Sequence, residues 1–389
     1  MPRAQDATLW TPELKRKNEA AEGPAVWTRA ERRDGSRPSG PVEPEPQGVI
    51  FQESFGDQPD WHSGLPQNDH GSPAGLPDRV QTAGTHIVPN GWFSVRQDPE
   101  WAPSVGHPDR HEAIEILAAN ADKARSGGKS YVSWRDSKTN PEFVNRFNSD
   151  SILAYRIEQG VSQIYVEFWI AFDPLWSPSG GSKLFRVSSW DQVGDIFGYG
   201  GGRNNGPVFF WDFLDFGTDV RNFCAFRGGK HGENYGLTQD RPEGFPRSAI
   251  PGSGGDFSFN WTSNVIGTLP DKSTESGTIS KQFGVDVGQH QIYGAGGEYN
   301  KMAFFLKINS APGVADGVFK MWKEDQPVIA SEAVMWVPEM DVVGEMPRWN
   351  IVALGGNDNF KEYPNEDRRE EWYSIDDLVI RHDIPENLT

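Results

Sequence analysis

The stretch Ser162-Gln-Ile-Tyr-Val-Glu-Phe-Trp-Ile-Ala-Phe172 alternates strictly between two kinds of side chain. Its even positions, from Ile164 to Phe172, are large and apolar, whereas its odd positions from Gln163 to Trp169 are polar or aromatic. Because successive side chains of a strand point to opposite faces of a sheet, this alternation predicts a strand with one buried face. The outer face of this strand would carry Gln163, Tyr165, Glu167 and Trp169.

The same period of two recurs over most of the chain. Lys301–Asn309 repeats the pattern, and Asp316-Gly317 after it is typical of a hairpin turn. Ala113–Leu117 is interpreted as a strand followed by a helical turn that ends at Gly127-Gly128. Further strands are expected at 129–135, 151–157, 182–188, 207–213, 220–226, 316–322, 348–354 and 371–381.

Two strand-like segments stand near opposite ends of this pattern, at Val49–Phe55 and at Trp372–Ile380. With little helical periodicity between them, they suggest one sheet domain whose first and last strands are neighbours. We therefore expect a single large antiparallel β-sandwich over residues 48–389, with a loop-rich insertion at 227–298 that is rich in Gly, Ser and Pro.

Residues 1–47 differ from the rest, because prolines are frequent and large apolar side chains are few. Such a segment cannot bury enough surface to offset its ordering entropy alone. It is predicted to be an extended arm that docks on another protein through Trp10, Leu14 and Trp27. The alternative is a disordered leader in which the tryptophans are incidental.

Composition excludes several functions. The chain of 389 residues has a net charge of −18, which argues against nucleic-acid binding because phosphate contacts need clustered Lys and Arg. No apolar run approaches the ~18 residues of a membrane helix, so no membrane partner is expected. The first residues lack the pattern of a secretory signal. A glycine motif for nucleotide binding is also missing.

The C-terminal blocks Lys307–Trp322, Trp349–Gly356 and Ile375–Ile380 resemble the concanavalin A-like lectin/glucanase superfamily. The closer resemblance is to its jelly-roll polysaccharide lyases, which cleave alginate or glucuronan. It covers roughly residues 48–384 and rests on turns and core strands. The resemblance implies a jelly-roll sandwich and, as one function, β-elimination in a uronate-containing glycan.

Such a lyase must neutralise the uronate carboxylate, remove the C5 proton and protonate the leaving oxygen. Arg, Lys, Gln or Asn suits the first task, and Tyr, His or Lys suits the other two. Lys183 and Arg186 fall where the resemblance implies a basic strand, although the full catalytic motif of those lyases is not matched. The catalytic candidates are Lys183, Arg186, Tyr199, His290 and Tyr293.

A glycan-binding domain without turnover is the other interpretation. Sugar rings stack on aromatic planes, and their hydroxyls bind polar groups. The candidate platform consists of Gln163, Tyr165, Glu167, Trp169, Arg156 and Lys307. The alternative for Trp169 is that the 227–298 insertion covers it and makes it part of the core.

Neither function requires a cofactor. The resemblance implies a structural Ca²⁺ near the first and last strands, with Glu53, Asp376 and Asp377 as carboxylate donors. Alternatively, these carboxylates cap turns or accept backbone N–H bonds.

The functional hypothesis rests on three features: an N-terminal arm, a domain of a type that binds glycans, and the lack of a secretory signal. The chain is predicted to be a decoration protein on the surface of a bacterial virus, on the capsid or the tail. It would bind other virion proteins through residues 1–47 and a polysaccharide or cell-surface glycan through the sandwich. The alternative is a polysaccharide lyase. A homo-oligomer is compatible with the sequence, which leaves the oligomeric state open.

Overall fold

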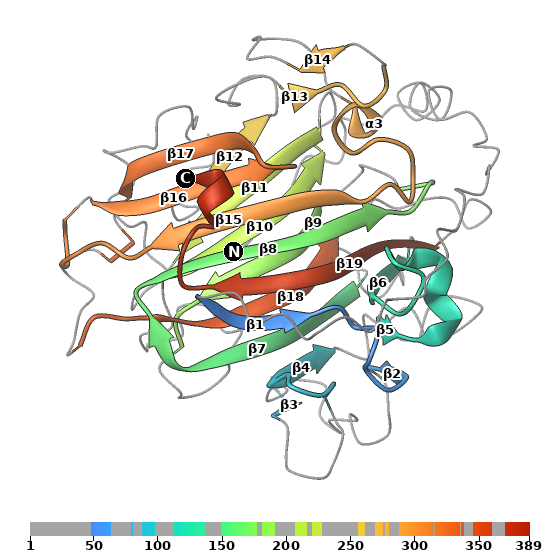
Figure 1. Ribbon diagram of the computed structural model, residues 1–389, viewed down its shortest axis with the longest axis horizontal. Coiled ribbons are helices and arrows are strands. Elements are labelled where there is room, and N and C mark those ends of the chain that lie inside the picture. The colour runs from blue at the N-terminus through green and yellow to red at the C-terminus, as the bar shows by residue number, and fades with distance from the viewer. Residues whose placement is uncertain are drawn as a thin grey trace, which may run out of the picture.

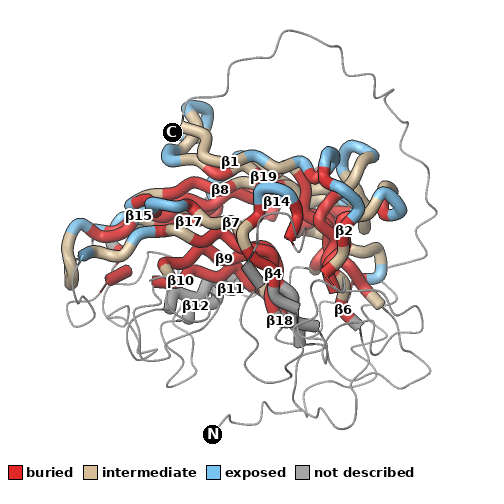
Figure 2. Tube along the Cα trace, turned by 90° about the horizontal axis from the view of Figure 1, so that it is seen from below, coloured by how far each residue is buried: buried red, intermediate tan, exposed pale blue. Residues whose placement is uncertain are grey.

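The computed structural model describes residues 48–63, 79–80, 88–97, 113–136, 149–176, 181–190, 207–215, 220–227, 256–260, 269–274, 277–279, 288–314, 316–334, 336–337, 345–359 and 370–389. Within these residues, strands dominate and form two large antiparallel sheets. The two sheets pack face to face as two layers, which Figure 2 shows edge-on. The predicted all-β jelly-roll sandwich is therefore confirmed.

Sheet A is the nine-stranded layer that faces the viewer in Figure 1. Its ninth strand, β1 (Val49–Glu53), pairs with β19. The order of the others is β17 (Gln326–Val334), β16 (Gly317–Lys323), β15 (Asn300–Lys307), β8 (Gln163–Phe172), β19 (Glu370–Arg381), β6 (Tyr131–Asp136), β5 (Ile114–Ile116) and β2 (Trp61–His62).

Sheet B is the eight-stranded layer behind it. Its order is β12 (Asp256–Asn260), β11 (Val220–Arg227), β10 (Val208–Asp215), β9 (Gly181–Ser188), β18 (Trp349–Asn359), β7 (Ser149–Val161), β4 (Ser94–Gln97) and β3 (Arg79–Val80). A small ribbon pairs β13 (Leu269–Pro270) with β14 (Thr278–Ile279). In the part of the chain that the structure describes, the helical elements are short: two 3-10 helices, Ala118–Lys123 and Glu386–Leu388, and α3 (Gln289–Tyr293).

The first and last strands lie side by side, as the sequence predicted. β1 pairs with β19 through Phe51 and Ile380, and through Glu53 and Leu378, and the two ribbons run together in Figure 1. The strands expected from the period of two are all present, with boundaries shifted by a few residues. The strand and helical turn expected after Ala113 are also found.

The core lies between the two sheets. The even positions of β8 are buried, and Phe168 at its centre contacts aromatic rings from both layers. Its ring centroid lies 5.2 Å from that of Phe185 in sheet B and 6.0 Å from that of Phe304 in sheet A. The apolar face of β8 thus packs between the two sheets.

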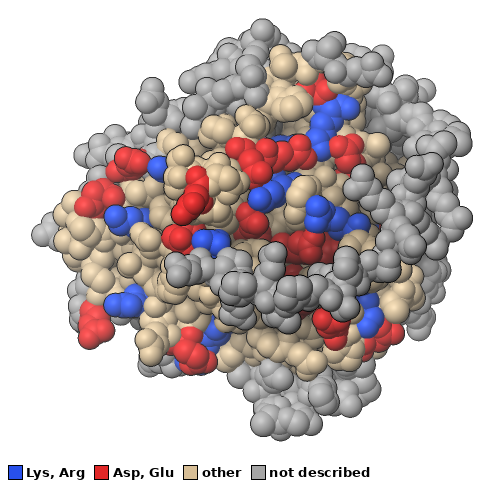
Figure 3. Space-filling view, in the orientation of Figure 1, with Lys and Arg blue, Asp and Glu red and all other residues tan. Residues whose placement is uncertain are grey.

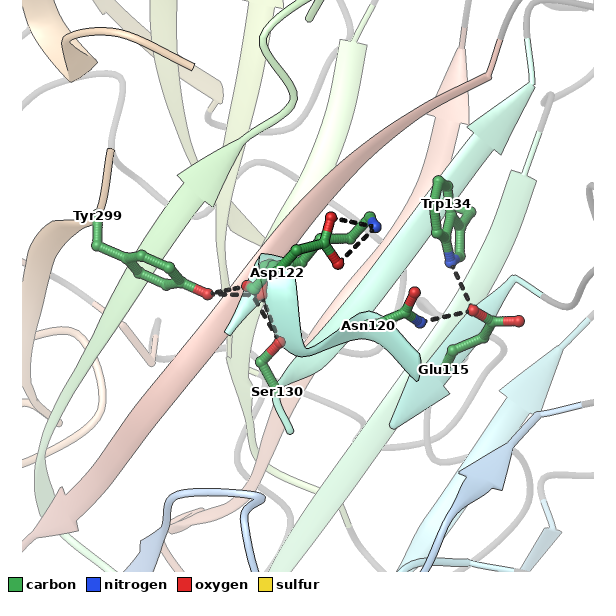
Figure 4. Close-up of polar contacts among 8 residues, drawn as sticks. Glu115, Asn120, Asp122, Ser130, Trp134 and Tyr299 are labelled. Atoms are coloured by element: carbon green, nitrogen blue, oxygen red, sulfur yellow. Dashed lines mark hydrogen bonds and ion pairs between the residues drawn. The ribbon is translucent and has the colours of Figure 1, made fainter. Parts of the chain in front are cut away.

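The 3-10 helix Ala118–Lys123 is fixed to one end of sheet A by buried hydrogen bonds (Figure 4). The Glu115 carboxylate accepts hydrogen bonds from Asn120 at 2.8 Å and from the Trp134 indole at 3.1 Å. The Tyr299 hydroxyl donates to the Lys123 carbonyl. Since Tyr299 lies 176 residues from Lys123 in the sequence, this last contact could not be inferred from local sequence.

None of the helices in the described part of the chain is long and apolar enough to cross a membrane. The predicted insertion at 227–298 contributes β12, the β13–β14 ribbon and α3 to the described residues. The arm residues Trp10, Leu14 and Trp27 lie outside the described residues, so the arm and its docking on virion proteins stay predictions.

Candidate functional site

The outer face of sheet B, turned away from sheet A, carries the candidate site. The inward side chains of this sheet, such as Phe185 on β9 and Phe209 on β10, pack in the main core. The residues that alternate with them form a separate apolar cluster on the other face: Ile152, Ala154, Ile351 and Ala353, with Phe93 and Trp190 against it. The polar side chains in register with this cluster lie on the same face.

Strand register places two arginines on this face. Arg186 on β9 lies between Phe210 on β10 and Ala353 on β18. Arg156 on β7 pairs with Ile351 of β18, which in turn pairs with Ser188 of β9. Directly opposed residues in a sheet share a face. The two arginines are therefore separated by β18, across a floor of apolar side chains.

A β-bulge in β9 adds Lys183 to this face. In a regular strand, residues three apart would point to opposite sides. Here Phe210 pairs with Arg186 but Asp212 pairs with Lys183, so β9 contains one extra residue between these two pairs. Because such a bulge re-aims side chains, Lys183 and Arg186 both lie on the face turned away from sheet A, where Arg186 is 4% exposed and Lys183 lies opposite Asp212.

The residues of β18 next to Arg186 and Lys183 have a small side chain or none. Ala353 stands beside Arg186, and Ala154 beside Ala353, whereas Ile351 stands beside Arg156 in the next row of this face. Gly356 lies against Lys183, and a Cβ at Gly356 would come 2.4 Å from the Lys183 Cβ. The glycine thus allows the lysine to lie close to β18.

Aromatic rings hold both guanidinium groups. The Arg186 Cζ lies 4.7 Å from the ring centroid of Phe210. The Arg156 Cζ lies 5.1 Å from the ring centroid of Phe93 and 5.7 Å from that of Trp190. Contacts of this kind stabilise a cation and fix its orientation.

The backbone of Trp190 is itself fixed by the side chain of Asn350. The Trp190 N–H donates to the Asn350 amide oxygen at 2.8 Å, and the Trp190 carbonyl accepts from the Asn350 amide nitrogen at 2.8 Å. Trp190 therefore marks a rigid end of the site, next to Phe93, whose ring centroid is 5.9 Å away.

Several buried polar atoms of this face have no hydrogen-bond partner among the described residues: Ser94 Oγ, Arg156 Nε, Ser188 Oγ and Trp190 Nε1. Leaving a buried donor unpaired costs about 1–3 kcal/mol. A bound ligand or ordered water would remove this cost. These four atoms are therefore available to a polar ligand on the outer face of sheet B, although the described residues hold other such atoms elsewhere.

The structure divides the predicted catalytic set. Lys183 and Arg186 come together on the outer face of sheet B. Tyr293 does not join them, because its side chain is buried in the core and its ring centroid lies 4.8 Å from that of Phe172. His290 stands with Tyr293 on α3, away from β9. Tyr199 lies outside the described residues.

The predicted glycan platform is divided between the two sheets. Arg156 faces outward from sheet B, whereas the others lie on β8 and β15 of sheet A: Gln163, Tyr165, Glu167, Trp169 and Lys307. They thus lie on opposite sides of the sandwich and cannot bind one sugar together. Figure 3, which views sheet A, shows acidic and basic side chains interspersed over this surface.

Tyr165 corrects the expectation of an exposed aromatic platform on sheet A. Its side chain is fully buried, packed with Phe305, Trp322 and, from the C-terminal segment, Leu388. Its hydroxyl donates to the Glu167 carboxylate. Burial, with the Glu167 charge, raises the pKa of Tyr165. This ring can neither stack on a sugar nor act as a base.

Trp169 and Glu167 are half-buried and already engaged. The Arg125 guanidinium lies over the Trp169 ring, 3.8 Å from its centroid. Glu167 forms an ion pair with Lys301 at 2.9 Å. The cover on Trp169 therefore includes Arg125 from the segment after the 3-10 helix, which the sequence did not suggest.

The three carboxylates assigned to calcium are occupied by protein donors. Glu53 accepts hydrogen bonds from the Phe55 N–H at 2.6 Å and from the Trp92 indole at 3.2 Å. Asp376 accepts from the backbone N–H groups of Arg125 and Asp377, and Asp377 forms an ion pair with Arg125. Within the described ranges, no group of three or more such residues could hold a metal ion. Their arrangement does not fit a Ca²⁺ site.

Asp376 makes stability depend on pH. It is fully buried, and burial followed by the Asp377 charge raises its pKa from 3.8 to about 7. Between these values the folded chain binds a proton that the unfolded chain does not. The free energy of unfolding should therefore fall as pH rises from 3.8 to about 7, with this residue contributing on the order of 2–4 kcal/mol.

Urea denaturation of the wild type and of Asp376→Asn across this pH range measures the effect. The difference in unfolding free energy between the two proteins should change with pH, because the variant lacks the titrating group. Parallel curves would show that Asp376 does not titrate in this range.

Sequence reasoning missed Phe93, Ser94 and Ser188 as members of the candidate site. The sequence offered no periodic signal for β4, and Ser188 is an ordinary strand-end residue. Only the register of β4, β7, β18 and β9 brings these residues together with Arg156.

No protein-family model and no curated protein matches the sequence. The structure is similar to the alginate lyase Aly36B in complex with an alginate trisaccharide, with 11% identity, coverage of 87% of this chain and 99% of that chain, and a TM-score of 0.44. It is also similar to an endo-β-1,4-glucuronan lyase from the fungus Trichoderma reesei (12% identity, 76% and 92% coverage, TM-score 0.42). A third similar structure is the alginate lyase vAL-1 from Chlorella virus (10% identity, 69% and 89% coverage, TM-score 0.38). These similarities are distant, and they assign neither residues nor an activity to this chain.

Proposed function

We propose that this chain binds a uronate-containing polysaccharide across the outer face of sheet B and cleaves it by β-elimination. The observation that carries the proposal is the bulge in β9, which turns Lys183 and Arg186 to one face. A base and an anion-binding group are thereby placed side by side. Arg156 lies on the same face, across β18.

Each step of the elimination has a group on this face. The Arg186 guanidinium binds the carboxylate of the reacting sugar, which stabilises the negative charge that develops when C5 loses its proton. The Lys183 side chain takes the C5 proton. The electron pair of the C5–H bond forms the C4–C5 double bond, and the C4–O bond breaks. The leaving oxygen then takes a proton from the lysine ammonium or from water.

Arg156 would bind a different sugar of the same chain. Neighbouring strands lie about 4.8 Å apart, so β7 and β9, on either side of β18, are roughly 10 Å apart. Arg186 is also held against Phe210 of β10, on the side of β9 away from β18, and Arg156 against Phe93 and Trp190, so different rings hold the two guanidinium groups. The two arginines therefore suit a polymer with repeated acidic groups better than a monosaccharide.

Incubation of the full chain with polymannuronate, polyguluronate and glucuronan tests the proposal. Elimination creates an unsaturated sugar, so ultraviolet absorbance should increase with at least one of these polymers and not with neutral dextran. Binding without an absorbance change would reduce the function to glycan binding. Absence of both binding and cleavage for all three acidic polymers would refute the proposal.

A further inference from the structure

Glu158 lies beside Arg156 on β7 and is turned toward solvent. β7 leaves its register with β18 immediately after Arg156, because Ile351 pairs with Arg156 but Trp349 pairs with Val161. The residues between them therefore bulge out of the ladder, and such bulges redirect side chains. The Glu158 carboxylate lies 3.1 Å from an Arg156 guanidinium nitrogen, and its side chain is 77% exposed.

The two partners of this ion pair are held very differently. The Arg156 guanidinium lies against the rings of Phe93 and Trp190 and is 18% exposed. Glu158 projects from the bulge into water. Ion pairs with an exposed member contribute about 0–1 kcal/mol, because solvent screens them and the long side chain loses entropy. The carboxylate can thus leave at little cost while the guanidinium stays in place.

We propose, on the basis of the function proposed above, that Glu158 is a specificity-determining residue that competes with the polysaccharide for Arg156. In the free protein its carboxylate occupies the position that a sugar carboxylate would take. An acidic sugar must displace it, whereas a neutral sugar at this position leaves it in place. Glu158 therefore lowers the affinity of the Arg156 end of the site for acidic sugars.

Sheet A offers a matched control for this ion pair. Lys320 and Glu332 also lie 3.1 Å apart, and the Glu332 side chain is 73% exposed. Glu158→Gln and Glu332→Gln remove the same charge from equally exposed positions on opposite faces of the sandwich. Any effect of net charge on a polyanion is common to both variants, so their difference isolates the contact with Arg156.

The experiment measures, by calorimetry, the Kd of full-length wild type and both variants for oligosaccharides of polymannuronate, polyguluronate and glucuronan. We expect Glu158→Gln to bind about two- to fivefold more tightly than Glu332→Gln, as the loss of a weak competing ion pair allows. The difference should shrink at high salt, which screens exposed charges. In turnover, KM should fall while kcat stays unchanged.

The outcomes separate the two proposals. If the wild type binds an acidic oligosaccharide but the two variants do not differ, or Glu158→Gln binds more weakly, the competition is refuted, whereas the proposed glycan binding stands and the absorbance assay decides cleavage. If the wild type binds none of the acidic oligosaccharides, the proposed function fails and this inference fails with it. Equal melting temperatures of the three proteins would confirm that the folds are intact.

Discussion

Replacing Lys183 with alanine should reduce kcat on the susceptible polyuronate by about 10²–10⁴-fold, the usual contribution of a positioned general base. Lys183 lies next to Arg186, so the group that takes the C5 proton is beside the group that binds the same sugar's carboxylate. Tyr155 on the nearby β7 cannot replace it, because its ring stacks in the interior on Phe51 at 4.1 Å. Initial rates of absorbance increase measure the effect.

Lys307→Ala is the matched control, since Lys307 is an exposed lysine on β15 of sheet A. This variant should retain the wild-type rate. Lys183→Arg should be as inactive as Lys183→Ala, because arginine keeps the charge but does not release its proton. If Lys183→Ala retained full turnover, the base would have to be another residue and the assignment would be wrong.

Much of the fold could be predicted because a strand with one buried face alternates between apolar and polar residues. In β8 the even residues from Ile164 to Phe172 are buried, as their alternation required. The odd positions were less predictable. Tyr165 has the same local pattern as Glu167, yet it is buried because Leu388 and its neighbours in the C-terminal segment pack over it. A segment that is distant in sequence can bury a strand residue, and the alternation within that strand does not show it.

The candidate site was predictable only in part, for a related reason. The sequence identified Lys183, Arg186 and Arg156 as polar strand residues of interest. It could not show that a bulge brings the first two to one face, because the bulge is defined by the partner strand β10. It also grouped Arg156 with the residues of β8, which belong to the other sheet. The sequence showed which residues are cationic. The face of the sandwich on which each one lies depends on the pairing of strands that are distant in sequence.

Breaking the buried ion pair between Arg135 and Glu371 should cause the largest loss of stability. These residues pair directly across β6 and β19, are 1% and 0% exposed, and lie 2.7 Å apart. The Arg135 Cζ also lies 3.4 Å from the ring centroid of Trp176. Glu371→Gln leaves the guanidinium buried without its counter-charge, which typically costs about 3–5 kcal/mol. Urea denaturation should show this decrease in the free energy of unfolding.

Two further variants separate burial from charge pairing. Lys320→Met breaks the exposed pair with Glu332 and should cost less than about 1 kcal/mol. The double variant Arg135→Met/Glu371→Leu removes both buried charges and should recover much of the stability lost in Glu371→Gln.

Arg135 also donates a hydrogen bond to the Ser182 hydroxyl at 2.8 Å, and Ser182 precedes Lys183 on β9. The double variant should therefore fold stably but cleave more slowly, because the start of β9 loses its link to sheet A. If Glu371→Gln cost no more than Lys320→Met, the pair would contribute little to stability.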